Sequence, residues 1–184
     1  MKKIIAIILT LLLVFALCGC GNSEQARFAE FIKTLAAAQD ISFTAKLRAE
    51  YADMTAQFTL DYVQNADGCT VEITEPKLIA GIRAHVDADG TRLEYEGAVL
   101  DIGRLTDDGL TPMSALPLLM RTLREAGADT LWFENELLAV QLMPSDNVTV
   151  KLWIDPDDLV PQNAEIAYKG QSVVFVQIEN WRIN

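Results

Sequence analysis

Short segments in which apolar and polar residues alternate occupy most of this chain, and they limit how it can fold more than any other feature. In the segment 43–51, Phe43, Leu47 and Tyr51 alternate with charged or hydroxyl side chains. Successive side chains of a β-strand point to opposite faces, so the pattern predicts strands with one apolar and one polar face. Such segments occur at 43–51, 56–62, 69–74, 82–86, 92–96, 138–142, 148–155 and 164–169.

Turn sequences and two further apolar segments complete the predicted sheet. Asn65–Gly68 and Asp87–Gly90 have the Asn, Asp and Gly composition of tight turns. Strands are also expected at 130–133 and at 173–178, the last being apolar on both faces. We therefore predict about ten antiparallel strands, and a single sheet of that size curls or splits.

One segment before the first strand has the periodicity of an α-helix instead. Ser23 suits the N-cap, and an acidic residue follows it in the first turn. The apolar residues then recur on one helix face, at Phe28, Phe31, Ile32 and Leu35. We expect this helix to end near Gln39 and Asp40.

A second helical segment interrupts the strands. Thr111 and Pro112 have the character of an N-cap and a first helical residue, and Gly127 suits a C-terminal stop. The residues between them are strongly apolar, so the helix must cover an apolar surface. Pro117 lies inside the segment, and we expect it to kink the helix or to split it into two short turns.

Together these elements predict the fold class. We expect an α+β fold in which a curved antiparallel sheet forms an incompletely closed β-barrel, with an N-terminal helix and an inserted apolar lid helix. No linker sequence marks a second domain, so residues 23–184 are predicted to form one half-barrel domain.

The N-terminus has the composition of a secretion signal. Two lysines, Lys2 and Lys3, precede an apolar run of 14 residues from Ile4 to Leu17 that only Thr10 interrupts. A membrane-spanning helix needs about 20 apolar residues. The pattern therefore predicts a signal peptide, residues 1–19, and the alternative is an uncleaved anchor helix.

The end of this run resembles a bacterial lipobox. The sequence Leu17-Cys18-Gly19-Cys20 has a leucine, two small residues and a final cysteine. That resemblance implies cleavage before Cys20, whose sulfur then carries a diacylglyceryl group, with fatty acids such as palmitate holding the protein to the membrane. Residues 20–22 form the lipidated N-terminus and a short tether, and two acyl chains suffice for stable anchoring. The expected location is the extracytoplasmic face of the cell membrane.

The charge of the chain excludes one class of partner and assigns the anchoring to the lipid. Fifteen basic and 26 acidic side chains give a formal charge of −11, and loss of Lys2 and Lys3 with the signal makes it −13. A nucleic-acid binder needs clustered lysine and arginine, so nucleic acid is not an expected partner. Anionic headgroups repel such a domain, so its protein surface does not hold it to the membrane.

The candidates for catalysis are few. Cys69 is the free thiol that remains after processing, and it fits a small buried side chain better than a reactive one. His85 is the single histidine, and we expect it to be solvated on a strand. The segment from His85 to Glu96 superficially follows the spacing of a calcium loop, but a plain hairpin turn is the favoured interpretation. We therefore expect no catalytic residues, no metal site and no cofactor.

The order of lipobox, helix, strands, apolar helix and strands resembles the superfamily of bacterial lipoprotein-localisation factors. This superfamily includes outer-membrane lipoprotein carriers and receptors and mycobacterial lipid-binding lipoproteins. The segments that carry the resemblance are Glu75–Ile82, Leu110–Pro112, Leu152–Pro156 with Leu159–Pro161, and Tyr168–Asn180. The signal and composition are similar to those of Gram-positive lipoproteins.

This resemblance implies a half-open barrel whose cavity takes acyl chains or other apolar ligands. The apolar strand residues would then line the cavity: Phe43, Leu47, Phe58, Leu60, Tyr62, Val71, Ile73, Ile82, Leu93, Tyr95, Val150, Leu152 and Ile166. The second helix would cover it as a lid, with Leu116, Leu119, Met120 and Leu123 as the capping side chains. A dry groove with few polar groups suits an acyl chain.

Two functions follow, neither enzymatic. The first is a membrane-anchored lipoprotein that holds an acyl chain or a lipidated client in its concave face. The alternative is the same fold with a filled core, which docks on or activates a cell-envelope or spore-germination protein. Trp153 is the residue that bears on the alternative: it either packs under the first helix or anchors a protein partner.

Overall fold

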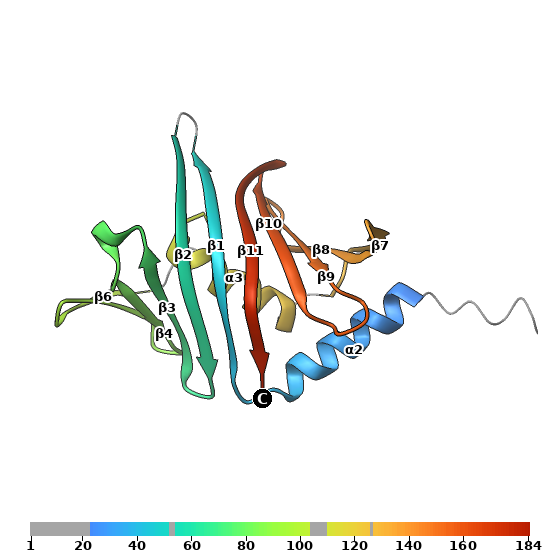
Figure 1. Ribbon diagram of the computed structural model, residues 1–184, viewed down its shortest axis with the longest axis horizontal. Helices are drawn as coiled ribbons and strands as arrows, with labels where there is room; N and C mark the ends of the chain where they lie inside the picture. Colours follow the sequence, from blue (N-terminus) through green and yellow to red (C-terminus); the bar gives the residue numbers. More distant parts are fainter. Residues whose placement is uncertain (1–22, 52–53, 104–109, 126) are drawn as a thin grey trace, which may run out of the picture.

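The computed structural model describes residues 23–51, 54–103, 110–125 and 127–184. The described part of the chain forms one antiparallel sheet of eleven strands with two α-helices (Figure 1). The predicted signal peptide (residues 1–19), Cys20 and the predicted tether 20–22 lie outside these residues. Neither helix of the described part is long and apolar enough to cross a membrane.

The sheet consists of two arms. The first arm holds β1 (Ile41–Tyr51), β2 (Met54–Asn65), β3 (Gly68–Glu75), β4 (Arg83–Val86), β5 (Thr91–Tyr95) and β6 (Ala98–Gly103). The second arm holds β7 (Thr130–Glu134), β8 (Leu137–Ser145), β9 (Val148–Ile154), β10 (Pro161–Tyr168) and β11 (Gln171–Ile183). The remaining elements are α2 (Ser23–Ala37), α3 (Pro112–Glu125) and a 3-10 turn, η1 (Lys77–Ile79).

Each arm is a meander, and the two arms meet where β1 pairs with β11. The strand order is β6-β5-β4-β3-β2-β1-β11-β10-β9-β8-β7, so β6 and β7 are the two edges of the sheet. The edges do not pair with each other, and the barrel is therefore incompletely closed. This confirms the α+β half-barrel predicted from the alternating segments.

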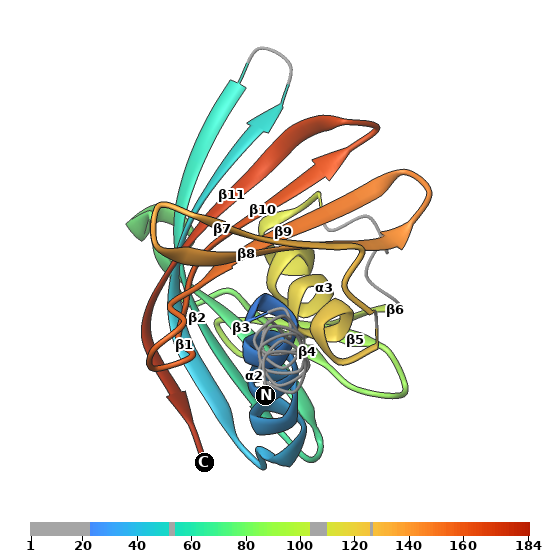
Figure 2. The same ribbon diagram turned by 90° about the vertical axis from the view of Figure 1, so that its right-hand side faces the viewer.

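The topology explains why the second helix is apolar. The chain leaves the sheet at one edge, β6, and must re-enter it at the opposite edge, β7. Helix α3 makes this crossing over the concave face, where α2 also lies (Figure 2). A helix laid across the dry face of a curved sheet is buried along most of its surface, so it needs apolar residues on more than one side.

The N-terminus of α3 is capped as predicted. The Oγ1 atom of Thr111 accepts a hydrogen bond from the backbone nitrogen of Ser114 at 3.2 Å, which is the geometry of an N-cap. Pro117 does not split the helix, which runs unbroken from Pro112 to Glu125. Pro117 removes one backbone hydrogen bond, but its apolar neighbours bury enough surface to keep the turn in place.

One additional strand and two element boundaries differ from the prediction. The sequence pattern indicated about ten strands, and the additional strand is β6, whose residues are all exposed and follow no simple alternation. Helix α2 ends at Ala37, slightly earlier than expected. β11 is longer than predicted because a bulge at Asn180, which has a positive φ of 55°, lets the strand continue to Ile183.

Candidate functional site

The concave face of the sheet is filled by side chains of the two helices. Nine of the thirteen cavity candidates are buried in one core cluster: Phe43, Leu47, Leu60, Tyr62, Val71, Ile73, Val150, Leu152 and Ile166. The same cluster holds Phe31 and Leu35 of α2. All four lid candidates also belong to it, and each is at most 2% exposed: Leu116, Leu119, Met120 and Leu123. An acyl chain at this position would have to displace these contacts.

The other four cavity candidates lie at the margins of this core. Phe58 and Ile82 are half-buried and pack against the cluster. Leu93 is half-buried on β5, and Tyr95, near the β5–β6 turn, is 40% exposed. The helices therefore do not cover the whole inner face of the sheet. At the β4–β6 end of the first arm, apolar side chains are exposed to solvent.

A cavity of about 1220 Å³ borders the filled core beside α3. The turns β2–β3 and β4–β5 form its far wall, and Pro117, Leu118 and Arg121 line it from the helix. Polar and charged groups, including Arg124, make up much of its surface. This space, which we call the α3 cavity, is therefore more polar than the dry groove expected for an acyl chain.

Tyr62 and Cys69 lie at the sheet side of the α3 cavity. The Tyr62 hydroxyl donates a hydrogen bond to Oε1 of Gln64 at 2.9 Å. Burial strongly raises the pKa of Tyr62, and the neighbouring Cys69 raises it further. Burial also raises the pKa of Cys69, so its thiol stays protonated at neutral pH and is a poor nucleophile.

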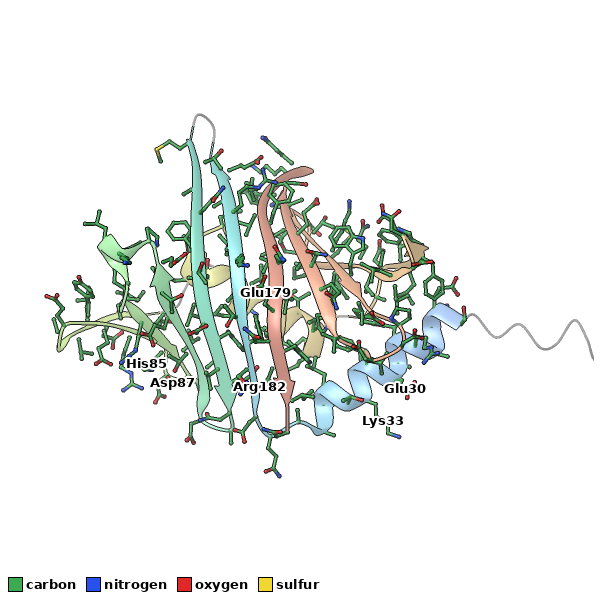
Figure 3. The ribbon with its side chains drawn as sticks, in the orientation of Figure 1. Glu30, Lys33, His85, Asp87, Glu179 and Arg182 are labelled. Carbon is green, nitrogen blue, oxygen red and sulfur yellow. The ribbon has the colours of Figure 1, made fainter. Side chains whose placement is uncertain are left out.

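The outer face of the sheet carries a row of side chains that only the strand register brings together. Paired residues on adjacent strands place Thr59 beside Lys46, Lys46 beside Gln177, and so on across the sheet. The complete row, from β2 to β7, is Thr59, Lys46, Gln177, Asn163, Trp153, Ala139 and Trp132. A second row beside it begins with Gln57, Arg48, Phe175 and Glu165. Glu179 lies on the same face of β11 (Figure 3).

The parts of these two rows on β2, β1, β11, β10 and β9 form the floor of a groove of about 1000 Å³, which we call the outer groove. Glu75 and Lys77, before and within η1, line one end, and Glu134 and Asn135 of the β7–β8 turn line the other. Apart from Phe58, whose side chain is on the inner face, the polar and aromatic residues of its lining are Lys46, Arg48, Gln57, Thr59, Glu75, Lys77, Glu134, Asn135, Trp153, Asn163, Glu165, Phe175 and Gln177. The groove faces away from both helices.

The aromatic side chains of the outer groove are held in place by polar neighbours. The indole nitrogen of Trp153 donates a hydrogen bond to the Glu134 carboxylate at 2.8 Å. The Arg48 guanidinium lies 4.2 Å from the centre of the Phe175 ring, which is a cation–π contact. Because α2 lies on the opposite face, the interpretation that Trp153 packs under the first helix is wrong.

The edge strand β6 is a second exposed feature. Val99 is 66% and Leu100 62% exposed, and as adjacent residues they point to opposite faces of the sheet. The two-residue turn at Glu96 and Gly97, both with positive φ, makes Tyr95 and Ala98 the first hydrogen-bonded pair of the hairpin. Antiparallel pairs alternate, so the backbone groups of Val99 point away from β5. No described strand pairs with this edge.

His85 and Asp87 lie at the β3–β4 end of the sheet and have partners in it (Figure 3). His85 contacts Thr70 Oγ1 at 3.0 Å and the Glu94 carboxylate at 3.2 Å. Asp87 accepts hydrogen bonds from the backbone nitrogens of Asp89 and Gly90, so its carboxylate closes the turn. Within the described ranges, no group of three or more His, Cys, Asp or Glu residues could hold a metal ion.

The sequence pattern missed the outer groove because its residues are far apart in the chain. Lys46, Trp153, Asn163 and Gln177 lie on four strands, and only the register aligns them. The one available signal was Trp153, an aromatic residue on the polar side of an alternating strand. Its neighbours are ordinary surface residues when read along the sequence.

Comparison with known proteins gives the fold. No family model and no curated protein matches the chain. Among solved structures, an uncharacterised conserved protein from Thermus thermophilus has a TM-score of 0.52 at 9% identity, covering 87% of each chain. A DUF1329 family protein from Desulfovibrio piger has a TM-score of 0.51 at 10% identity and covers 87% of this chain and 92% of that one.

The matching structures also include a LolA superfamily protein from Nitrosomonas europaea. It is 11% identical, covers 87% of this chain and 93% of that one, and has a TM-score of 0.47. Its superfamily is the one that the sequence resembles. At such low identity the two structures with TM-scores above 0.5 show a shared fold alone, and the fold of this chain is the α+β half-barrel described above.

Proposed function

We propose that this chain is a lipid-anchored, non-enzymatic docking protein of the cell envelope. Its half-barrel acts as a rigid scaffold whose concave face is occupied by its own helices. The supporting observation is that all four lid candidates and nine cavity candidates pack into one core. An anchored protein with a filled barrel has its outer surfaces left for recognition.

The anchor in this proposal is Cys20, at the end of the lipobox-like sequence. The short tether 20–22 keeps the domain close to the extracytoplasmic face of the membrane. A protein held there by two acyl chains does not need an apolar membrane-binding surface of its own. The exposed apolar side chains are therefore available to bind another protein.

The proposed docking surface is the free edge of β6. An edge strand presents unpaired backbone groups, and natural proteins commonly protect it with lysine, proline or a covering element. β6 carries apolar side chains on both faces, and its one charged residue is Asp101. An extended segment of an envelope protein can add to this edge as a further strand.

The acidic residues near the β6 edge indicate which kind of extended segment can pair with it. Asp101 lies on β6, and Glu94 and Glu96 lie on and beside the neighbouring strand β5. A directly opposed basic side chain stabilises a strand pair, whereas a like charge destabilises it. A second copy of this acidic chain would bring its own carboxylates to the edge. The occupant we propose is therefore a strand of another protein that carries lysine or arginine.

Disruption of β6 in the full-length chain tests this proposal. Native electrophoresis of detergent-solubilised membranes should show the wild-type chain in a complex with a second protein. Val99→Pro removes an outward-facing donor without breaking the β5–β6 ladder, and it should dissolve the complex. Leu78→Lys, which changes an exposed apolar residue of η1, should leave the complex intact. A monomeric wild type, or a complex that survives Val99→Pro, contradicts docking at β6.

A second candidate function is that the protein holds an acyl chain or a lipidated client. The supporting observation is the α3 cavity, where Arg121 and Arg124 could face an anionic headgroup. Mass spectrometry of lipid extracted from the purified chain tests it. Equimolar lipid that is lost in Arg124→Glu would support this function over the filled-core proposal. A wild-type chain that stays empty after incubation with membrane lipids would remove it.

A further inference from the structure

Most of the floor of the outer groove offers no free backbone groups to a ligand. It is built from β2, β1, β11, β10 and β9; each of these strands has a neighbour on both sides, and β2 is paired with β3 from Thr59 onward. An extended peptide therefore cannot add to the sheet here as it can at an edge. Side chains therefore provide the main recognition groups on the floor of the outer groove.

The charged side chains of the outer groove are balanced in number, and Lys46, Arg48, Glu134 and Glu165 have partners in it or at its border. Three basic residues (Lys46, Arg48 and Lys77) and three acidic residues (Glu75, Glu134 and Glu165) line it, in a chain whose formal charge is −11. Lys46 contacts Glu179 at 2.6 Å, and Arg48 pairs with Glu50. Glu134 accepts from Trp153, and Glu165 accepts from Ser172. With three charges of each sign, the groove has no net charge to attract an ion, so it suits a neutral ligand.

The aromatic residues provide an apolar platform on this polar floor. Ala139 is on the outer face between Trp153 on β9 and Trp132 on β7, and it is only 1% exposed. A small side chain at such a position is covered only if its larger neighbours lean over it. The Trp153 indole donates to Glu134 on β7, so it reaches across β8, where Ala139 lies, and Trp153 also lines the groove.

Amide side chains continue the row from this platform. Asn163 is paired with Trp153 on one side and with Gln177 on the other, and Gln57 lies on β2 in the adjacent row. Each amide presents both donors and an acceptor. Their spacing follows the strands, so the floor from Thr59 to Trp153 spans four intervals of about 4.8 Å, or about 19 Å. That length exceeds a single sugar and fits a short oligomer.

A neutral ligand that combines apolar faces with many hydroxyl or acetamido groups matches this arrangement. Sugar rings have an apolar C–H face that can stack on an indole, and their substituents both donate and accept hydrogen bonds. The geometry points to the outer groove as a binding site for a neutral oligosaccharide, with Trp153 as the stacking residue and Asn163 and Gln177 as the polar contacts. This inference is independent of docking at β6, which lies at the edge of the sheet.

Titration of the full-length chain in detergent with chitotetraose, a neutral oligomer of N-acetylglucosamine, tests the inference. Calorimetry should detect binding, and tryptophan fluorescence should change on saturation. Trp153→Ala should weaken binding at least tenfold, and Asn163→Ala or Gln177→Ala should weaken it several-fold. Gln171→Ala is the matched control, because it removes the same side chain from the same strand outside the groove, and it should bind like the wild type.

Trp153→Phe keeps an aromatic ring and should retain part of the affinity, which separates stacking from loss of folding. Absence of binding at millimolar chitotetraose would overturn the inference, as would equal binding by wild type and Trp153→Ala. If the chain binds no sugar but forms a protein complex that Trp153→Ala dissolves, the oligosaccharide inference is also overturned, and the groove is assigned to a protein partner. Val99→Pro should leave sugar binding unchanged, so failure of the docking proposal does not affect this result.

Discussion

Truncation of one lid candidate measures how tightly the concave face is filled. Leu116 is on α3 and has no exposed surface, and its neighbours in the core cluster come from both helices and the sheet. Replacement of a fully buried leucine by alanine costs about 2–5 kcal/mol, because the lost transfer energy is joined by the energy of the cavity left behind. We expect Leu116→Ala to lower the free energy of unfolding by about 3 kcal/mol. For a chain of this size the corresponding fall in Tm is about 6–12 °C.

Urea unfolding followed by tryptophan fluorescence measures this loss. The matched control is Leu78→Ala on η1, where the side chain is 87% exposed and truncation should change the stability by less than about 0.5 kcal/mol. Both variants remove the same atoms, so their difference isolates burial. The m-value should stay unchanged, since neither variant alters the surface exposed on unfolding.

The result also separates a packed helix from a removable lid. If α3 covered an empty hollow, the Leu116 side chain would lack partners on one side and its removal would cost much less. A loss below about 1 kcal/mol with native helix content would refute the reasoning that the core is filled. A loss that disappears when lipid is added would place a ligand beside this side chain instead.

Three further predictions concern the anchor, a turn and a titrating group. Cys20→Ser should move the chain from the membrane to the soluble fraction with an unchanged circular dichroism spectrum; continued retention would contradict the lipobox assignment. Gly68→Ala should cost more than about 2 kcal/mol in urea unfolding, because φ is +141° and the new Cβ would lie 2.3 Å from the Val86 carbonyl oxygen. Hydrogen bonds from the following backbone, chiefly Asp89, hold the pKa of Asp87 below its ordinary value. The stability that the Asp87 carboxylate contributes is present above its pKa in the unfolded chain and is lost as the pH falls through its pKa in the folded chain. NMR should therefore find the titration midpoint of the Asp87 carboxyl below that of a free aspartate. An ordinary midpoint would contradict the turn geometry.

The alternation of the sequence predicted the sheet well because it reports directly on a face that is kept dry. β6 escaped this reasoning for the same reason: it lies at an edge, both of its faces are exposed, and Val99 and Leu100 are adjacent apolar residues. Pro117 misled the prediction in a different way. Pro117 does remove one backbone hydrogen bond from the helix, as expected, but the burial of α3 on several sides outweighs that loss.

What fills the dry face could not be read from the pattern. Alternation predicts that Leu47 and Leu152 face inward, and it does so equally well for a core and for a ligand cavity. The answer depends on the volume that α2 and α3 bring to that face, which is set by their position and not by their sequence period. The outer groove depends on register in the same way, since Trp153, Asn163 and Gln177 become neighbours only once β9, β10 and β11 are aligned.

The topology makes the concave face of the sheet less accessible to ligands than the outer face. Because α3 leads from the β6 edge to the β7 edge, it cannot leave the concave face without moving as a loop held at both edges of the sheet. A ligand could enter the core only when buried side chains such as Leu119 and Leu123 separate, and the cost of that opening would reduce its apparent affinity. The outer groove and the β6 edge need no such opening. Mutations that loosen α3 should therefore change binding on the concave face and leave recognition at the outer groove and the β6 edge unaffected, provided that the sheet itself stays folded.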